Sequence, residues 1–134
     1  MDFDKINVGD AMPEEKNPVG KYQPMYYAGA SGDFNPIHID PEFGKMVGLG
    51  GNILQGLCTM AFAAKAAWNY AGDPGALKHL KVRFAKPVKP LDTVVVGGKV
   101  VAKEGGAITL EIGASTNKGA VEVLTNSVAT LRKA

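Results

Sequence analysis

The chain has one cysteine, Cys58, and no long uninterrupted hydrophobic run, and these two deficits exclude whole classes of protein. A single thiol cannot form an internal disulfide, so the pattern of a disulfide-stapled secreted domain is missing. Residues 46–64 carry no charge and have the length of a membrane span, but four glycines and several polar residues interrupt them. Residues 1–10 are acidic and mixed, unlike a signal peptide. We therefore expect a cytoplasmic protein with no membrane partner.

A strong excess of charge is missing as well. The formal net charge is +2 and charged residues make up 21% of the chain, so nothing indicates a nucleic acid partner. A chain of 134 residues, 46% of them hydrophobic, is long enough for one core, and we expect a single domain over residues 1–134. Glycine is in excess, with 17 residues, which we expect at tight turns and close backbone approaches.

The hydrophobic pattern predicts an α+β fold, an antiparallel sheet around one long helix. The helix is predicted over residues 52–71, with Asn52 as N-cap and Gly72 at its end, and with apolar residues on nearly all its faces. It should therefore be buried nearly all round. Five strands are predicted to cover it, the last four as an antiparallel meander with turns at Gly105-Gly106 and 117–119; they span residues 6–12, 78–85, 93–103, 108–115 and 121–131. An exposed sheet edge and an uncovered helix flank favour a dimer.

The polar side chains that could take part in catalysis or ligand binding concentrate in one short segment: Ser31, Asp33, Asn35, His38 and Asp40. Gly32 permits a sharp turn and Pro36 prevents a continuous helix, so Asp33 and His38 can meet at one site. Three familiar sites fail on spacing. Gly44 stands where a calcium loop needs Glu, Asp33 stands where a serine-hydrolase turn around Ser31 needs Gly, and a zinc site lacks ligands.

Two interpretations of this cluster remain open on the residues alone. Asp33 and His38 can act as a general acid–base pair at one proton-transfer site. Alternatively, Asp33 and Asn35 can satisfy backbone N–H groups in a capped loop, with His38 as a buried hydrogen-bonding residue. No metal ligand set is predicted in either case.

The segment Tyr27–Phe43 contains Ser-Gly-Asp-x-Asn-Pro-Ile-His-x-Asp-Pro, which closely resembles the signature of the MaoC-like dehydratase family. That family comprises (R)-specific enoyl-CoA hydratases and (3R)-hydroxyacyl-thioester dehydratases. The resemblance continues through Gln55-Gly56-Leu57 and residues 82–88, so it covers about two-thirds of the chain. It implies the hot-dog fold, in which a sheet wraps a central helix.

The resemblance also implies a reaction, a carbon–oxygen lyase reaction without a cofactor. Water adds across the 2,3 double bond of a trans-2-enoyl thioester, on CoA or acyl carrier protein, to give the (3R)-hydroxy product, or the reverse dehydration occurs. It assigns the acid–base pair to Asp33 and His38, with Asn35 and Ser31 in support. Gly56 is our candidate for the oxyanion hole, because its N–H lies in the first turn of the helix, where amides are unpaired.

The chain departs from the family pattern at two positions. Gln55 stands where the family commonly has His, beside the expected oxyanion hole, and Leu91 stands where it commonly has Gly. Gln55 is expected to alter the pocket near the oxyanion hole, and Leu91 is expected to alter only the shape of the loop in which it lies. Neither removes the Asp33 and His38 pair.

Partners and alternative functions complete the expectations. We expect a homodimer, with a heterodimer with another hot-dog chain as the alternative. A non-catalytic acyl-thioester-binding or partner subunit, and a hot-dog thioesterase, are the competing functions; residues 46–72 lack the helix carboxylate that many hot-dog thioesterases use. One basic stretch is either a solvated strand face or a contact for CoA phosphates or an acidic carrier protein: Lys78, Lys81, Arg83, Lys86 and Lys89.

Overall fold

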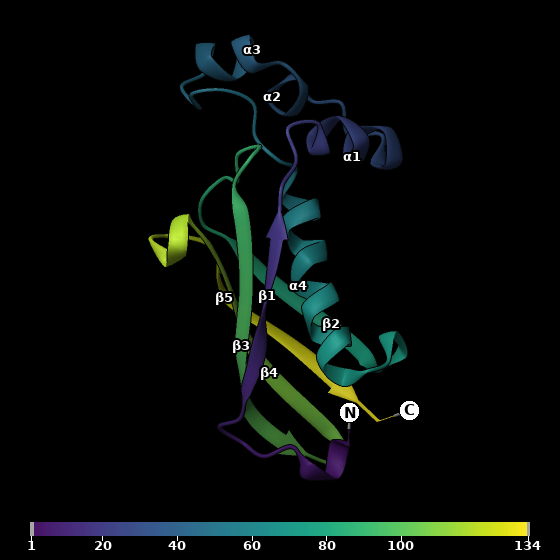
Figure 1. Cartoon of the computed structure of the whole chain (residues 1–134). Coiled ribbons are helices and arrows are strands. Elements are labelled where there is room, and N and C mark those ends of the chain that lie inside the picture. The colour runs from purple at the N-terminus through teal and green to yellow at the C-terminus, as the bar shows by residue number, and fades with distance from the viewer. Residues whose placement is uncertain (1, 134) are drawn as a thin grey trace.

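The computed structural model describes residues 2–133 and consists of a curved five-stranded antiparallel sheet and four α-helices (Figure 1). The strands are β1 (Ala11–Pro18), β2 (Leu77–Phe84), β3 (Thr93–Glu104), β4 (Ala107–Thr116) and β5 (Val121–Arg132). The helices are α1 (Gln23–Ser31), α2 (Pro36–Ile39), α3 (Pro41–Met46) and α4 (Gly56–Ala71), with short 3-10 helices η1 (Phe3–Lys5), η2 (Pro74–Ala76) and η3 (Asn117–Gly119).

The core lies between the sheet and α4, around which the sheet bends (Figure 1). Along β4, Ile108, Leu110 and Ile112 are buried and alternate with more exposed residues, which is the period of a strand that is covered on one face. Small residues such as Ala63 and Ala67 are fully buried on α4 and let the helix approach the sheet closely. The predicted α+β arrangement, a sheet wrapped around one long helix, is confirmed.

The strand order β1-β3-β4-β5-β2 differs from the predicted meander. Only β3, β4 and β5 follow one another across the sheet. β2 pairs with β5 at one edge, and β1 pairs with β3 at the other. The predicted first strand, residues 6–12, is wrong as well, because β1 runs from Ala11 to Pro18. An edge strand tolerates Pro13 and Pro18, whose missing N–H groups cost no ladder bond on the open side.

The long helix begins at Gly56 rather than after Asn52, so the predicted N-cap is wrong. Residues before Gly56 bond to other segments instead of forming a helical turn: Ile53 N–H donates to the Ile37 carbonyl at 2.9 Å, and Leu54 N–H donates to the Val88 carbonyl at 2.8 Å. The Asn52 side chain donates to the His38 carbonyl at 2.8 Å. These bonds tie the segment before α4 to α2 and to the loop after β2.

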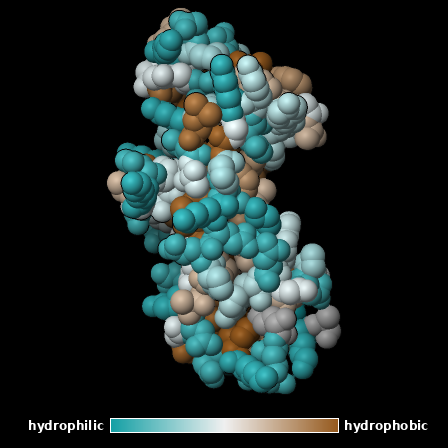
Figure 2. All heavy atoms as spheres, viewed as in Figure 1, coloured by the Kyte–Doolittle hydropathy of each residue, from teal (hydrophilic) through white to brown (hydrophobic). Residues whose placement is uncertain are grey.

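The helix is buried on one face only, which corrects the prediction of burial nearly all round. Within the chain, Leu57 and Ala61 on its opposite flank are exposed. The helices α1, α2 and α3 project beyond the end of the sheet (Figure 1), and Figure 2 shows hydrophobic side chains on this projecting lobe. Its exposed hydrophobic residues include Met25, Phe34, Met46 and Val47.

Candidate active site

The polar segment folds into a braced loop between α1 and α2. Gly32 ends α1 in the left-handed conformation with φ of 78°, which glycine adopts without a steric penalty. The Ser31 hydroxyl donates to the Tyr27 carbonyl at 2.7 Å and accepts from the Asp33 N–H at 3.1 Å. The Asn35 side chain caps α2 by accepting from the Ile37 N–H at 3.2 Å. Ser31 and Asn35 therefore hold the backbone on both sides of Asp33.

Asp33 and His38 face each other, with 3.5 Å between Oδ2 and Nε2. The His38 side chain is 9% exposed, whereas that of Asp33 is 47% exposed, so solvent reaches the pair from the carboxylate side. His38 Nδ1 lies 2.8 Å from the Ile53 carbonyl. Because a carbonyl oxygen only accepts, Nδ1 carries a proton and donates it, which leaves the lone pair of a neutral ring on Nε2.

This tautomer determines what can lie between the two groups. An unprotonated Nε2 and an ionised carboxylate both accept hydrogen bonds, and two acceptors repel each other unless a donor is shared. A water molecule that donates one hydrogen to each group satisfies both. The geometry of Asp33 and His38 is therefore suited to holding a water molecule and exchanging protons with it.

Gly56 supplies a free donor next to this pair. It is the first residue of α4, and its N–H has no acceptor among residues 2–133. A Cβ on Gly56 would lie 3.2 Å from the Phe84 ring, so glycine keeps the approach to this N–H open. Gly56, His38, Thr59 and Phe84 line one cavity of about 230 Å³. The unpaired amide and the imidazole thus open onto the same space.

Gln55 was noted in the sequence only as a departure from the family pattern, yet it connects three parts of the site. It is 1% exposed, and its Nε2 donates to the Pro24 carbonyl at 2.9 Å and to the Asp33 carbonyl at 3.4 Å. Its Oε1 has no hydrogen-bond partner within the described part of the chain. Gln55 therefore positions Asp33 against the start of α4.

We expect Gln55→Ala to lower both stability and turnover. The change leaves the Pro24 and Asp33 carbonyls without their donor, which costs about 1–3 kcal/mol of unfolding free energy. Denaturant unfolding measures this loss, and steady-state kinetics should show a fall in kcat because Asp33 loses its support. Asn69→Ala is the matched control, since the Asn69 amide contacts Glu15 in an exposed position. Equal stability of the two variants would contradict the role of Gln55.

Two other ionisable groups near the site stay neutral. Burial raises the pKa of the Cys58 thiol, although a hydrogen bond from Gln23 lowers it in part. Burial also raises the pKa of the Tyr27 hydroxyl, and the nearby charges of Cys58 and Asp33 raise it further. The thiol is buried and is therefore a poor nucleophile at neutral pH.

Cys58 should react slowly with iodoacetamide in the native protein. A raised pKa keeps the thiol protonated at neutral pH, and the thiolate needed for alkylation forms only as the pH rises above the usual thiol range. We expect fast labelling in denaturant and slow labelling without it, followed by intact mass. Equal rates in the two conditions would contradict the burial of this side chain.

The structure brings together most of the predicted site residues and separates others. Asp33, His38 and Gly56 converge, but the Asp40 carboxylate caps α3 by accepting from the Glu42 and Phe43 N–H groups. Among residues 2–133, no group of three or more His, Cys, Asp or Glu could hold a metal ion. None of the helices described over the same range has the length and apolar character needed to cross a membrane.

A curved antiparallel sheet that bends around one long helix defines a hot-dog fold, and here the loop that carries Asp33 and His38 lies near the start of that helix. The family described as the MaoC like domain matches residues 7–123. The chain therefore belongs to this family, as the motif in residues 27–43 predicted.

Three similar proteins illustrate the relationship. A solved structure titled MaoC-like dehydratase has a TM-score of 0.92 and 28% identity, over 98% of this chain and 42% of that one. The (R)-hydratase from A. caviae involved in PHA biosynthesis has a TM-score of 0.85 at 22% identity, covering 97% of this chain and 98% of its own, which confirms the hot-dog fold. The peroxisomal enoyl-CoA hydratase 2 of Arabidopsis thaliana is 48% identical over 67 residues, 48% of this chain and 22% of that protein. The chain thus spans about a fifth of this curated relative.

Proposed function

We propose that the protein catalyses the reversible hydration of trans-2-enoyl thioesters to (3R)-hydroxyacyl thioesters. One observation carries this proposal: the Asp33–His38 pair and the unpaired Gly56 N–H lie at the same end of α4, and His38 and Gly56 line one cavity. Membership of the MaoC-like family and the name of the Arabidopsis relative support it.

In this proposal Asp33 and His38 share the work of general base and general acid. The water held by the two acceptors loses one proton to the pair as its oxygen bonds to C3 of the substrate. The pair then returns a proton to C2, so the product gains a hydroxyl at C3 and a hydrogen at C2. The reverse sequence eliminates water. Neither direction consumes an external oxidant or reductant.

Gly56 is proposed to bind the thioester oxygen. Negative charge grows on this oxygen as water attacks C3, so a donor fixed in advance stabilises the transition state more than the ground state. The Gly56 N–H is unpaired and belongs to the N-terminus of α4, where the helix dipole also favours negative charge.

The test is incubation of the purified protein with trans-2-enoyl thioesters of several chain lengths, on CoA and on acyl carrier protein. Hydration removes the conjugated double bond, so the absorbance of the enoyl thioester should decrease with time. The reaction should also run from the (3R)-hydroxyacyl-CoA side. Absence of hydration and dehydration with every substrate would overturn the proposal.

We further propose that two copies assemble into a homodimer. Among residues 2–133, β2 is an edge strand that pairs only with β5, and the exposed Leu57 and Phe84 lie beside the candidate site, where a second chain would cover them. Light scattering after gel filtration should give twice the mass of the chain. A fully active monomer would contradict this assembly, and activity only with a second, different chain would favour a heterodimer.

A further inference from the structure

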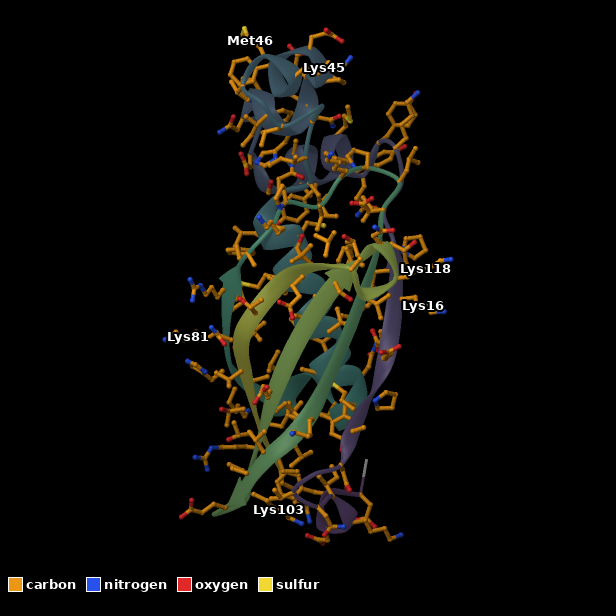
Figure 3. The ribbon with its side chains drawn as sticks, turned by 90° about the vertical axis from the view of Figure 1, so that its left-hand side faces the viewer. Lys16, Lys45, Met46, Lys81, Lys103 and Lys118 are labelled. Carbon is orange, nitrogen blue, oxygen red and sulfur yellow. The ribbon has the colours of Figure 1, made fainter. Side chains whose placement is uncertain are left out.

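His38 lies on α2, a helix of a single turn in the lobe that projects beyond the end of the sheet. α2 spans only Pro36–Ile39, and one turn of helix is too short to be stable on its own. Figure 3 shows Lys45 and Met46, at the end of the neighbouring α3, at the tip of the same lobe. Contacts from other parts of the chain must therefore fix the position of His38.

The segment that returns from α3 to α4, residues 47–55, supplies these contacts. The last carbonyl groups of a helix have no partners within that helix. In α2, the Ile37 carbonyl accepts from the Ile53 N–H at 2.9 Å. The His38 carbonyl accepts from the side-chain amide of Asn52 at 2.8 Å. The returning segment thus completes the C-terminal end of α2.

His38 is held at two points by two adjacent residues of the returning segment. Asn52 bonds the main-chain carbonyl of His38, and the Ile53 carbonyl lies 2.8 Å from Nδ1 of its ring. The main chain of α2 and the tautomer of the imidazole therefore depend on the same short piece of backbone. Movement of α2 relative to this piece would change the distance between Nε2 and the Asp33 carboxylate, which is 3.5 Å.

The returning segment is itself fixed on two further sides. The Leu49 N–H donates to the Gly44 carbonyl of α3 at 2.8 Å, and the Leu54 N–H donates to the Val88 carbonyl at 2.8 Å. A Cβ on Gly44 would overlap the Gly51 carbonyl, so the backbone of α3 lies directly against the segment. A rigid support of this kind is what a positioning side chain needs.

We propose that Asn52 is a positioning residue for His38, because its amide holds α2 where Nε2 and the Asp33 carboxylate can share one water molecule. Asn52 does not line the cavity at Gly56, and its amide donates to a backbone carbonyl, so it acts on the reaction only through His38. This inference rests on the proposed function, since it takes Asp33 and His38 as the acid–base pair.

Asn52→Asp tests this role with almost no change of shape. The ionised carboxylate has no donor and repels the His38 carbonyl, so kcat for crotonyl-CoA hydration should fall by about tenfold to hundredfold. KM should change less, because the side chain lies outside the cavity. Asn52→Gln retains the amide donor and should keep more of the turnover.

Asn7→Asp is the matched control for this substitution. The Asn7 amide also donates to a backbone carbonyl, that of Lys5, but at the opposite end of the molecule (Figure 1). The control adds the same charge and should retain the kcat of the wild type. Wild-type kcat in a folded Asn52→Asp protein would overturn the proposal. If Asn52→Asp does not fold, Asn52→Ala removes the donor without adding a charge, and the same criterion applies to it.

The double variant Asn52→Asp/His38→Ala separates positioning from a purely structural role. If Asn52 acts through His38, the double variant should have the same kcat as His38→Ala, because no imidazole remains to be positioned. A structural role would instead lower kcat again, by the same factor as Asn52→Asp lowers it in the wild type. That second loss would remove Asn52 from the account of the site.

Nuclear magnetic resonance of the His38 ring tests the contact without catalysis. In the wild type, the proton on Nδ1 should exchange slowly with water, because it donates to the Ile53 carbonyl. The signal should be absent from His38→Ala, exchange faster in Asn52→Asp and stay unchanged in Asn7→Asp. An unchanged signal in Asn52→Asp would overturn the proposal. If the signal responds as expected but the wild type hydrates no enoyl thioester, the proposed function is wrong and Asn52 still positions His38.

Discussion

We expect Asp33→Asn to lower kcat for crotonyl-CoA hydration by about 10²–10⁴-fold, the usual contribution of a positioned acid–base group. The amide has the shape of the carboxylate and can still accept from the Asn35 N–H, which lies 3.3 Å from Oδ1. It cannot, however, take a proton from water. Because the Asp33 side chain is half exposed, its replacement should leave the melting temperature nearly unchanged. Steady-state kinetics and a circular dichroism melt measure the two effects.

Asp40→Asn is the matched control for this prediction. Asp40 lies seven residues further along the same polar segment, between α2 and α3, where its carboxylate caps α3, and an Asn side chain can make the same cap. Its turnover should be close to that of the wild type. His38→Ala should lose activity like Asp33→Asn, and the double variant should lose little more than either single one, because the two groups act as a unit. Near-normal turnover in either single variant would remove our assignment of the pair.

Gly56→Pro should reduce kcat by about 10²–10³-fold relative to Gly56→Ala, the usual loss when one oxyanion-hole donor is removed. Proline lacks the N–H that we assign to the thioester oxygen, whereas alanine keeps it. Both variants place a Cβ close to the exposed Phe84 ring, so comparing them cancels the effect of this added Cβ. The measurement is kcat for both proteins with the same enoyl-CoA.

The fold should accept this proline. Gly56 is the first residue of α4, a position that proline favours, and Gln55 has φ of −58° and ψ of 134°, which suit a residue before proline. Similar unfolding curves for the two variants are therefore expected. Equal turnover in two folded variants would show that the Gly56 N–H does not bind the transition state.

The features that the sequence predicted well depend on neighbouring residues. The turn at Gly105-Gly106 joins β3 to β4, and Gly72 ends α4, because each needs only the local chain. The predicted helix start failed because Ile53 and Leu54 bond to segments distant in sequence. The predicted meander placed β2 next to β3, whereas β2 pairs with β5. This prediction was wrong for the same reason, because pairing between strands that are not consecutive leaves no local pattern in the sequence.

In the candidate site, too, residues close in sequence were predicted, whereas contacts between residues distant in sequence were not. Asp33 and His38 were found because they are close in sequence and lie in a motif, and the loop geometry brings them within reach of each other. The contact of Gln55 with the Asp33 carbonyl was not predicted, because the two residues are 22 positions apart and a lone Gln carries no chemical signature.

The most direct test of the central claim is the stereochemistry of the hydration product. The protein would be incubated with crotonyl-CoA, and the product would be assayed with dehydrogenases specific for (3R)- and for (3S)-hydroxyacyl-CoA. We predict that the wild type forms only (3R)-hydroxybutyryl-CoA and that Asp33→Asn forms almost none. A (3S) product, or (3R) product formed equally by both proteins, would contradict the assignment of Asp33 and His38 as the hydrating pair.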